Sequence, residues 1–307
     1  MRYVIRFVVG ISLVAACPSL RAQPGQSGMA FLKLGVTGRG IAMGDAMGAD
    51  VTGSAATYYN PAGLLGPAGE PSSSQLVFMH REWIQDTRTE FLGSSIPLGE
   101  ENAFGLALNS TTVSDIELRT RPGPADGTFS ARQLSFGLSF SHRLGDDLRL
   151  GATGKFLYQK ILTDEESGFA ADLGAQWRTP LQNLTIGAAF SNLGSMSGIL
   201  GEKTILPSLM RLGPAYSIDL PSDQLHATVA ADFLRIFPET RNYLDTGAEI
   251  VFNHLVAARA GYEFGSEGRG LSLGVGIQYG VILLDYAFSK LSADLGDTHT
   301  ISLALNI

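Results

Sequence analysis

From residue 75 onward, apolar residues alternate with small or polar residues at a period of two. In residues 133–141 the even positions hold Leu or Phe, whereas Gln, Ser and Gly occupy the odd positions. The same alternation recurs in residues 271–279 and 300–307. Because successive side chains of a β-strand point to opposite faces, the pattern predicts strands and not amphipathic helices.

Segments of this kind recur about fourteen times before the chain ends. They begin near residues 75, 89, 103, 132, 148, 169, 184, 208, 225, 243, 255, 271, 281 and 299. Most run for about 8–11 residues, the length that a tilted strand needs to cross a bilayer. The pattern predicts an all-β fold over residues 75–307, a transmembrane outer-membrane β-barrel of about 14 antiparallel strands.

The connections between these segments alternate in length. One set is short, at residues 99–102, 143–147, 179–183, 219–224, 253–254 and around 280. The other set is mostly longer, at residues 84–88, 111–131, 162–168, 192–208, 236–242, 265–270 and 290–298. Outer-membrane barrels combine short periplasmic turns with longer outer loops, so we expect the short set to face the periplasm.

The two faces of the predicted strands differ in composition. The apolar face carries almost no charge, as contact with lipid requires, so outer-membrane lipid is an expected partner. The other face is mostly Gly, Ala, Ser and Thr, which suits a crowded lumen better than the watery side of the alternative fold, a soluble β-sandwich. The sparse charges expected to face the lumen are Arg149, Lys155, Asp172, Arg211, Asp232, Asp245, Glu249, Arg259, Glu263 and Asp285.

The first residues read as an export leader, so we expect a signal peptide over residues 1–22. Arg2 and Arg6 precede an apolar run over residues 7–16, which is too short to span a bilayer. Cleavage after Ala22 is the first interpretation, and a lipidated Cys17 is the alternative. Both imply export, and the strand pattern places the mature chain in the outer membrane of a Gram-negative-type envelope.

Residues 23–74 lack clean alternation, and we expect them to form an N-terminal hatch with short helical turns inside the barrel. A barrel of about fourteen strands is too wide for wall side chains alone to fill. Asn60, Pro61, Ala62 and Gly63 are predicted to form a turn of this hatch, because Pro disfavours helix at the preceding residue, Asn can close an Asx-turn and Gly accepts a positive φ. The alternative is a flexible periplasmic tail.

The remaining signals exclude several classes of protein. The formal net charge of −7 argues against nucleic-acid binding. Cys17 is the single cysteine, so cleavage after Ala22 would leave neither a disulfide scaffold nor a thiolate site. No residue spacing indicates a metal site, a cofactor or a catalytic nucleophile, and we expect no enzyme activity.

Several segments together resemble the PorV/PorQ family of outer-membrane proteins, which is related to the FadL-type transporters of hydrophobic compounds. The N-terminal segment ends in "TYYNPAGL", and the FadL hatch also carries Asn-Pro-Ala. The segments that carry the resemblance are residues 28–64, 187–194, 206–216, 247–264 and 283–305.

The resemblance implies a fourteen-stranded barrel with an N-terminal plug. It further implies export or surface attachment of partner proteins, as in type IX secretion, with secreted cargo or secretion-system proteins as partners. The alternative is a FadL-like uptake channel for small hydrophobic compounds. The small, charged lumen face favours the protein-partner role, because a transporter needs an apolar pocket beside the hatch.

Overall fold

The computed structural model describes residues 27–69, 73–84, 86–198, 203–220, 224–292 and 296–307. The expected signal peptide, with Cys17 and Ala22, lies outside the described residues. None of the helices in the described ranges has the length and hydropathy needed to span a membrane.

Fourteen antiparallel strands form one closed barrel, which confirms the predicted fold class. Each strand pairs with its neighbours in the chain, and β1 pairs with β14, so the sheet has no free edge along the wall. The strands are β1 (Gln75–Glu82), β2 (Thr87–Leu98), β3 (Asn102–Leu118), β4 (Gly127–Leu144), β5 (Leu148–Ile161), β6 (Asp164–Arg178), β7 (Leu184–Met196), β8 (Leu209–Asp219), β9 (Leu225–Ile236), β10 (Arg241–Phe252), β11 (Val256–Phe264), β12 (Arg269–Tyr279), β13 (Ile282–Leu291) and β14 (Asp297–Asn306).

Large apolar side chains cover the outside of the barrel. Across β2 to β6, the register aligns Leu92, Leu108, Phe136, Phe156 and Phe169 in one row, and all five are exposed. The residues between them on each strand are smaller and point inward, as the period of two requires. A closed sheet with an apolar outer face is the arrangement that suits a lipid environment.

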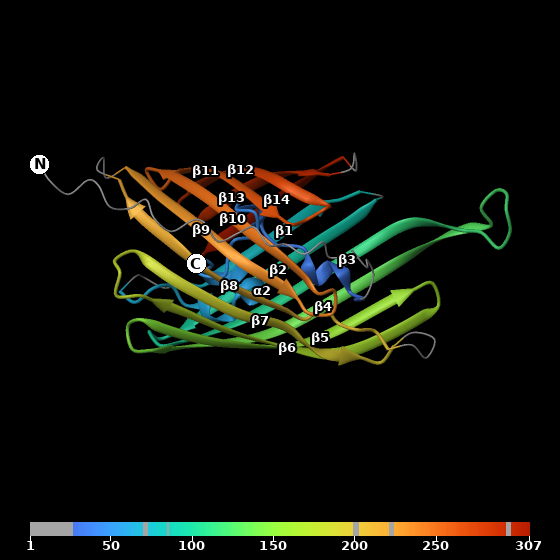
Figure 1. Ribbon diagram of the computed structural model, residues 1–307, viewed down its shortest axis with the longest axis horizontal. Coiled ribbons are helices and arrows are strands. Elements are labelled where there is room, and N and C mark those ends of the chain that lie inside the picture. The colour runs from blue at the N-terminus through green and yellow to red at the C-terminus, as the bar shows by residue number, and fades with distance from the viewer. Residues whose placement is uncertain (1–26, 70–72, 85, 199–202, 221–223, 293–295) are drawn as a thin grey trace, which may run out of the picture.

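The strands are less uniform in length than the sequence pattern predicted. β3 has 17 residues and β4 has 18, and they project together beyond the barrel at one end (Figure 1). The expected long connection at residues 111–131 is therefore mostly a paired hairpin, and the one at residues 162–168 is a tight turn at residues 162–163. Thr111, Thr112 and Val113 continue β3 where apolar alternation stops, because β-branched residues favour extended backbone.

The described N-terminal residues 27–69, called the hatch below, lie between the walls of the barrel (Figure 1). Their short helical elements are η1 (Ala30–Lys33), α1 (Gly38–Ala42), η2 (Gly53–Ala55), α2 (Ala56–Tyr59) and η3 (Pro61–Leu64). Thr37 caps α1, because its side chain accepts a hydrogen bond from the Gly40 amide. The helices stay short since Gly and Pro punctuate the segment.

The main apolar core is shared between the hatch and the wall. Met43, Met47 and Leu65 of the hatch share one buried cluster with Val77 and Phe91 of the wall. A second cluster joins the start of the hatch to β5–β7, with Met29, Phe31, Leu32, Leu157, Ala170, Met196 and Leu206. The hatch thus depends on the barrel for its burial of apolar surface.

Candidate functional site

The predicted turn at residues 60–63 is one turn of 3-10 helix, η3, against the inner wall. Asn60 is fully buried and extended, with φ −161° and ψ 104°. Its side-chain oxygen accepts a hydrogen bond from the Ala62 amide at 3.2 Å. Its side-chain amide donates to the carbonyls of Gly48 at 2.7 Å and of Ala175 on β6 at 3.0 Å. One Asn side chain therefore joins two parts of the hatch to the wall.

Gly63 is required for a different reason from the expected one. Its φ is not positive, and a Cβ at this position would meet the carbonyl of Val51. Ala62 and Pro61 are also buried, and the Ala62 carbonyl accepts a hydrogen bond from the Ser141 hydroxyl at 3.0 Å. The small residues of this turn follow from close packing and not from backbone strain.

Glycines of the wall mark where the hatch backbone touches it, and the sequence interpretation missed them. A Cβ on Gly151 of β5 would meet the main chain of Pro61 and Ala62. On β7, a Cβ on Gly187 would meet the main chain of Gly48. Glycine allows backbone to approach this closely. Other inward glycines that face hatch atoms are Gly93, Gly105, Gly174, Gly247, Gly261 and Gly274. A glycine at a strand position that faces the lumen is the sequence signal that could have identified these contacts.

A network of ion pairs connects the hatch to β10, β11 and β13. Arg39 of α1 donates to Glu249 at 2.8 and 3.1 Å, and it also pairs with Asp50 of the hatch. Arg259 pairs with the same Glu249 and, at 2.6 Å, with Asp285. Burial alone would lower the pKa of Arg39, but Asp50 and Glu249 outweigh it and raise that pKa above its usual range.

A second charged cluster lies against β8–β12. It is nearer the barrel end that carries the β3–β4 hairpin and the connection at residues 265–268, called the long-loop end below; the opposite end is called the short-turn end. Arg211 lies 3.2 Å from Asp232 and 3.0 Å from Asp245, and it donates to the Asp45 carbonyl. The Asp232 carboxylate also accepts the Gly48 amide of the hatch at 2.7 Å. In a buried site, each such charge needs partners, because an unpaired one would be costly.

Asp45 is the hatch residue at the centre of this region. Its carboxylate accepts a bond from Arg269 at 2.7 Å and one from the Tyr59 hydroxyl at 2.7 Å. Arg269 also pairs with Glu263 at 2.5 Å. Burial, with the neighbouring carboxylate, raises the pKa of Tyr59 well above its usual range, so the hydroxyl stays a hydrogen-bond donor.

The remaining charges predicted for the lumen lie on β5 and β6. Lys155 and Asp172 pair within the wall at 2.6 Å and do not contact a charged hatch residue among those described. Arg149 donates to the carbonyl of Leu65 in the hatch at 2.5 Å. The charges listed from the sequence are all less than a tenth exposed. Arg39, the hatch partner of Glu249, and the pair of Asp45 with Arg269 were missed because such pairing depends on the three-dimensional arrangement.

Two cavities lie at opposite ends of the hatch. At the long-loop end, a cavity of about 250 Å³ separates the start of the hatch from the wall. Its lining is apolar on several sides, with Leu34, Trp83, Ile84, Leu234, Tyr243 and Leu291. Lys33, Glu263 and Arg269 form its charged margin. This cavity is called the outer pocket below.

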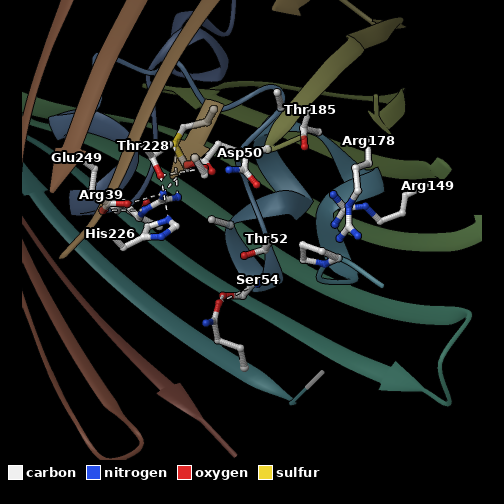
Figure 2. Close-up of a pocket in the computed structure, with 18 of the residues that line it drawn as sticks. Arg39, Asp50, Thr52, Ser54, Arg149, Arg178, Thr185, His226, Thr228 and Glu249 are labelled. Carbon is white, nitrogen blue, oxygen red and sulfur yellow. Dashed lines mark hydrogen bonds and ion pairs between the residues drawn. The ribbon is translucent and has the colours of Figure 1, made fainter. Parts of the chain in front are cut away.

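At the short-turn end, a larger cavity of about 730 Å³ lies beneath the hatch and is called the basin below (Figure 2). Arg149 and Arg178 lie side by side on one of its walls, and Arg39, Glu249 and His226 lie across from them. Among the described residues, no group of three or more His, Asp or Glu side chains is arranged to hold a metal ion.

No family model matches the chain, and no curated protein does so either. Solved structures do match, with low identity. The toluene transporter TbuX of Ralstonia pickettii is 15% identical with a TM-score of 0.59, over 89% of this chain and 98% of that chain.

The monoaromatic hydrocarbon channel TodX, as a deletion mutant, is 14% identical with a TM-score of 0.52, over 87% of this chain and 98% of that one. A FadL homologue of Pseudomonas aeruginosa is 12% identical with a TM-score of 0.52, over 88% and 98%. The chain therefore has the fold of FadL-type outer-membrane barrels, and these matches do not distinguish a PorV/PorQ relative within it.

Proposed function

We propose that this protein is an outer-membrane uptake channel for small hydrophobic compounds. This was the alternative interpretation of the sequence, and the outer pocket is the observation that carries it. The pocket is concave and mostly apolar, with a few polar groups at its margin, as small-molecule sites are. At about 250 Å³ it suits a compound of one or two rings or a short alkyl chain.

The position of the outer pocket supports uptake rather than storage. Lys33 and Leu34 of the hatch form its inner side, so a bound compound would touch the segment that blocks the lumen. The solved structures named as a toluene transporter and a monoaromatic hydrocarbon channel share the fold, which makes apolar compounds reasonable first candidates. In this proposal, the hatch closes the pore between passages of the compound.

Uptake of labelled toluene into cells that carry the protein in the outer membrane tests the proposal. Leu234→Gln places an amide in the outer pocket and should lower uptake about tenfold, since it removes apolar contact and adds an unpaired polar group. Leu181→Gln makes the same change in the basin and should leave uptake unchanged. Equal uptake by both variants and the parent protein would refute the pocket's role.

A second candidate function is surface attachment or export of partner proteins, as the PorV/PorQ resemblance implies. The projecting β3–β4 hairpin favours it. β2 pairs with β3 only as far as Val113, and β5 pairs with β4 only from Ala131, so the hairpin beyond them has two free edges. Free strand edges offer backbone groups to which a partner strand can add.

Removal of residues 116–129 distinguishes the two candidates. If the hairpin binds cargo, the chain should restore protein export in a type IX strain that lacks its own PorV-type barrel, and the shortened chain should not. Toluene uptake should survive the deletion if the channel proposal is correct. Loss of both activities with an intact barrel would count against assigning separate sites to them.

A further inference from the structure

The basin contains positive charge that the hatch does not use. Arg178 ends β6, and its side chain makes no hydrogen bond or ion pair in the described part of the chain. Its strand neighbour across the sheet is Thr185, whose side chain also lines the basin. Arg149, on β5, lines the same wall (Figure 2).

The state of Arg178 differs from that of four other inward arginines near the hatch. Arg39, Arg211, Arg259 and Arg269 each pair with two carboxylates. A guanidinium offers five donors in a planar fork that matches carboxylate and phosphate oxygens. The Arg178 guanidinium instead lines the basin, where its donors have no protein partner among the described residues.

A third arginine adds to the positive wall. Arg143 of β4 lies directly opposite Arg149 across the sheet, and its Nη2 donates to the Gly66 carbonyl at 2.7 Å. Its Nε is buried and has no partner among the described residues. The inward positions at the ends of β4, β5 and β6 therefore each hold a cation, and the nearest hatch groups are the carbonyls of Leu65 and Gly66.

The acidic groups across the basin limit what can bind there. Asp50, Glu249 and Asp285 are already paired with Arg39 or Arg259. Asp219 lies 2.8 Å from His226 at the rim. These carboxylates would repel a long polyanion that filled the basin, but none of them pairs with Arg178, whose guanidinium stays available to a compact anion.

We propose that the basin binds a small anion that carries carboxylate or phosphate groups, with Arg178 as its main donor, Arg149 as a neighbouring positive charge and Thr185 as a hydroxyl partner. The volume of about 730 Å³ is that of a small-molecule site. Bidentate, charge-assisted hydrogen bonds to arginine supply both affinity and orientation. This site is at the other end of the hatch from the outer pocket and does not depend on the uptake proposal.

Calorimetric titration of the full-length protein in detergent tests the site, with citrate and inorganic phosphate as separate probes. We expect one of them to bind at submillimolar concentration, which identifies the preferred anion. Arg178→Gln should weaken that binding about tenfold, because it removes a charge-assisted pair of hydrogen bonds. Arg178→Lys should weaken it less, since the charge remains while the fork is lost.

Arg121→Gln is the matched control, because it removes one positive charge from an exposed turn at the opposite end of the molecule. It should leave binding unchanged. Equal weakening by Arg121→Gln and Arg178→Gln would overturn the proposal, since it would indicate general charge attraction. Failure of both probes to bind would also overturn it, as would binding of a glutamate-rich peptide when neither small anion binds.

Discussion

Strands β8–β13 and strands β1–β6 face the same hatch but contact it through different groups. On β8–β13, carboxylates and arginines of the wall bind charged or polar groups of the hatch, as Arg39 with Glu249 shows. On β1–β6, no described wall side chain forms an ion pair with the hatch, and wall arginines donate to hatch carbonyls: Arg81 to Gly35, and Arg149 to Leu65. Glycines allow close approach on both sides.

The difference suggests that the two sides have separate roles. Ion pairs depend on charge and respond to salt at their exposed margins, whereas bonds to main-chain carbonyls depend on the hatch keeping its fold. We infer that the contacts between the hatch and β8–β13 break first when the hatch moves. The contacts with β1–β6 then keep the hatch bound to the wall.

Removal of the hatch should have the largest effect, because it abolishes both sides at once. Deletion of residues 28–68 should leave a barrel that still inserts but conducts ions steadily in planar bilayers, since wall side chains cannot close a barrel this wide. The intact protein should conduct little. A deletion that conducts no more than the full chain would show that these residues do not close the pore.

Gly151→Leu should unseat the hatch on the β1–β6 side. Its side chain would meet the main chain of Pro61 and Ala62, which cannot move aside, so we expect a loss of about 1–3 kcal/mol in hatch docking. Gly154→Leu on the same strand points outward into open space and is the control. Proteolysis of the hatch should increase in Gly151→Leu alone, and equal protection of both variants would contradict this seating.

Arg39→Met should weaken the β8–β13 side while β1–β6 still hold the hatch. It leaves Asp50 and part of Glu249 unpaired, which should cost about 1.5–3 kcal/mol. We expect brief openings in single-channel records instead of steady conduction. Arg235→Met, which removes a charge that has no hatch contact among the described residues, should leave the records unchanged. Steady conduction by Arg39→Met would contradict the proposal that β1–β6 hold the hatch when the contacts with β8–β13 are weakened.

The smallest effect concerns Glu239 in the turn between β9 and β10, which lies 2.5 Å from Lys33 of the hatch. Partial burial opposes its charged form, but bonds from Lys33 and Ser27 outweigh this and lower the pKa of Glu239. A lowered pKa stabilises the folded form at neutral pH, and this stability is lost as pH falls below the ordinary glutamate range. Hydrogen exchange at residues 27–34 should rise in that acid range, and less so in Glu239→Gln, which has already lost the charge.

The barrel could be predicted from the sequence because strand alternation is a local property. Each segment shows its own inward and outward faces, so the phase of Leu92 or Phe136 needs no knowledge of its neighbours. The same argument fails at residues 111–131, where the strands continue through Thr, Ser and Asp without apolar alternation.

Much less of the site could be predicted, because its contacts join residues that are distant in sequence. Alternation indicates that Glu249 and Arg259 share a face, but nothing local indicates that Arg39 reaches Glu249. The prediction that Gly63 adopts a positive φ was wrong because its requirement also depends on a contact that the local sequence does not show. The Val51 carbonyl excludes a side chain at Gly63 only once the hatch is folded.

The amide of Gly38 in the hatch bonds to the hydroxyl of Ser302 in β14 at 2.8 Å, across a sequence separation of 264 residues. The first part of the described chain thus contacts the last strand of the barrel. Contacts of such long range form slowly, because a large loop must close before they contribute. This bond can therefore form only once β14 has closed the cylinder, so α1 reaches its final contact with the wall late in assembly.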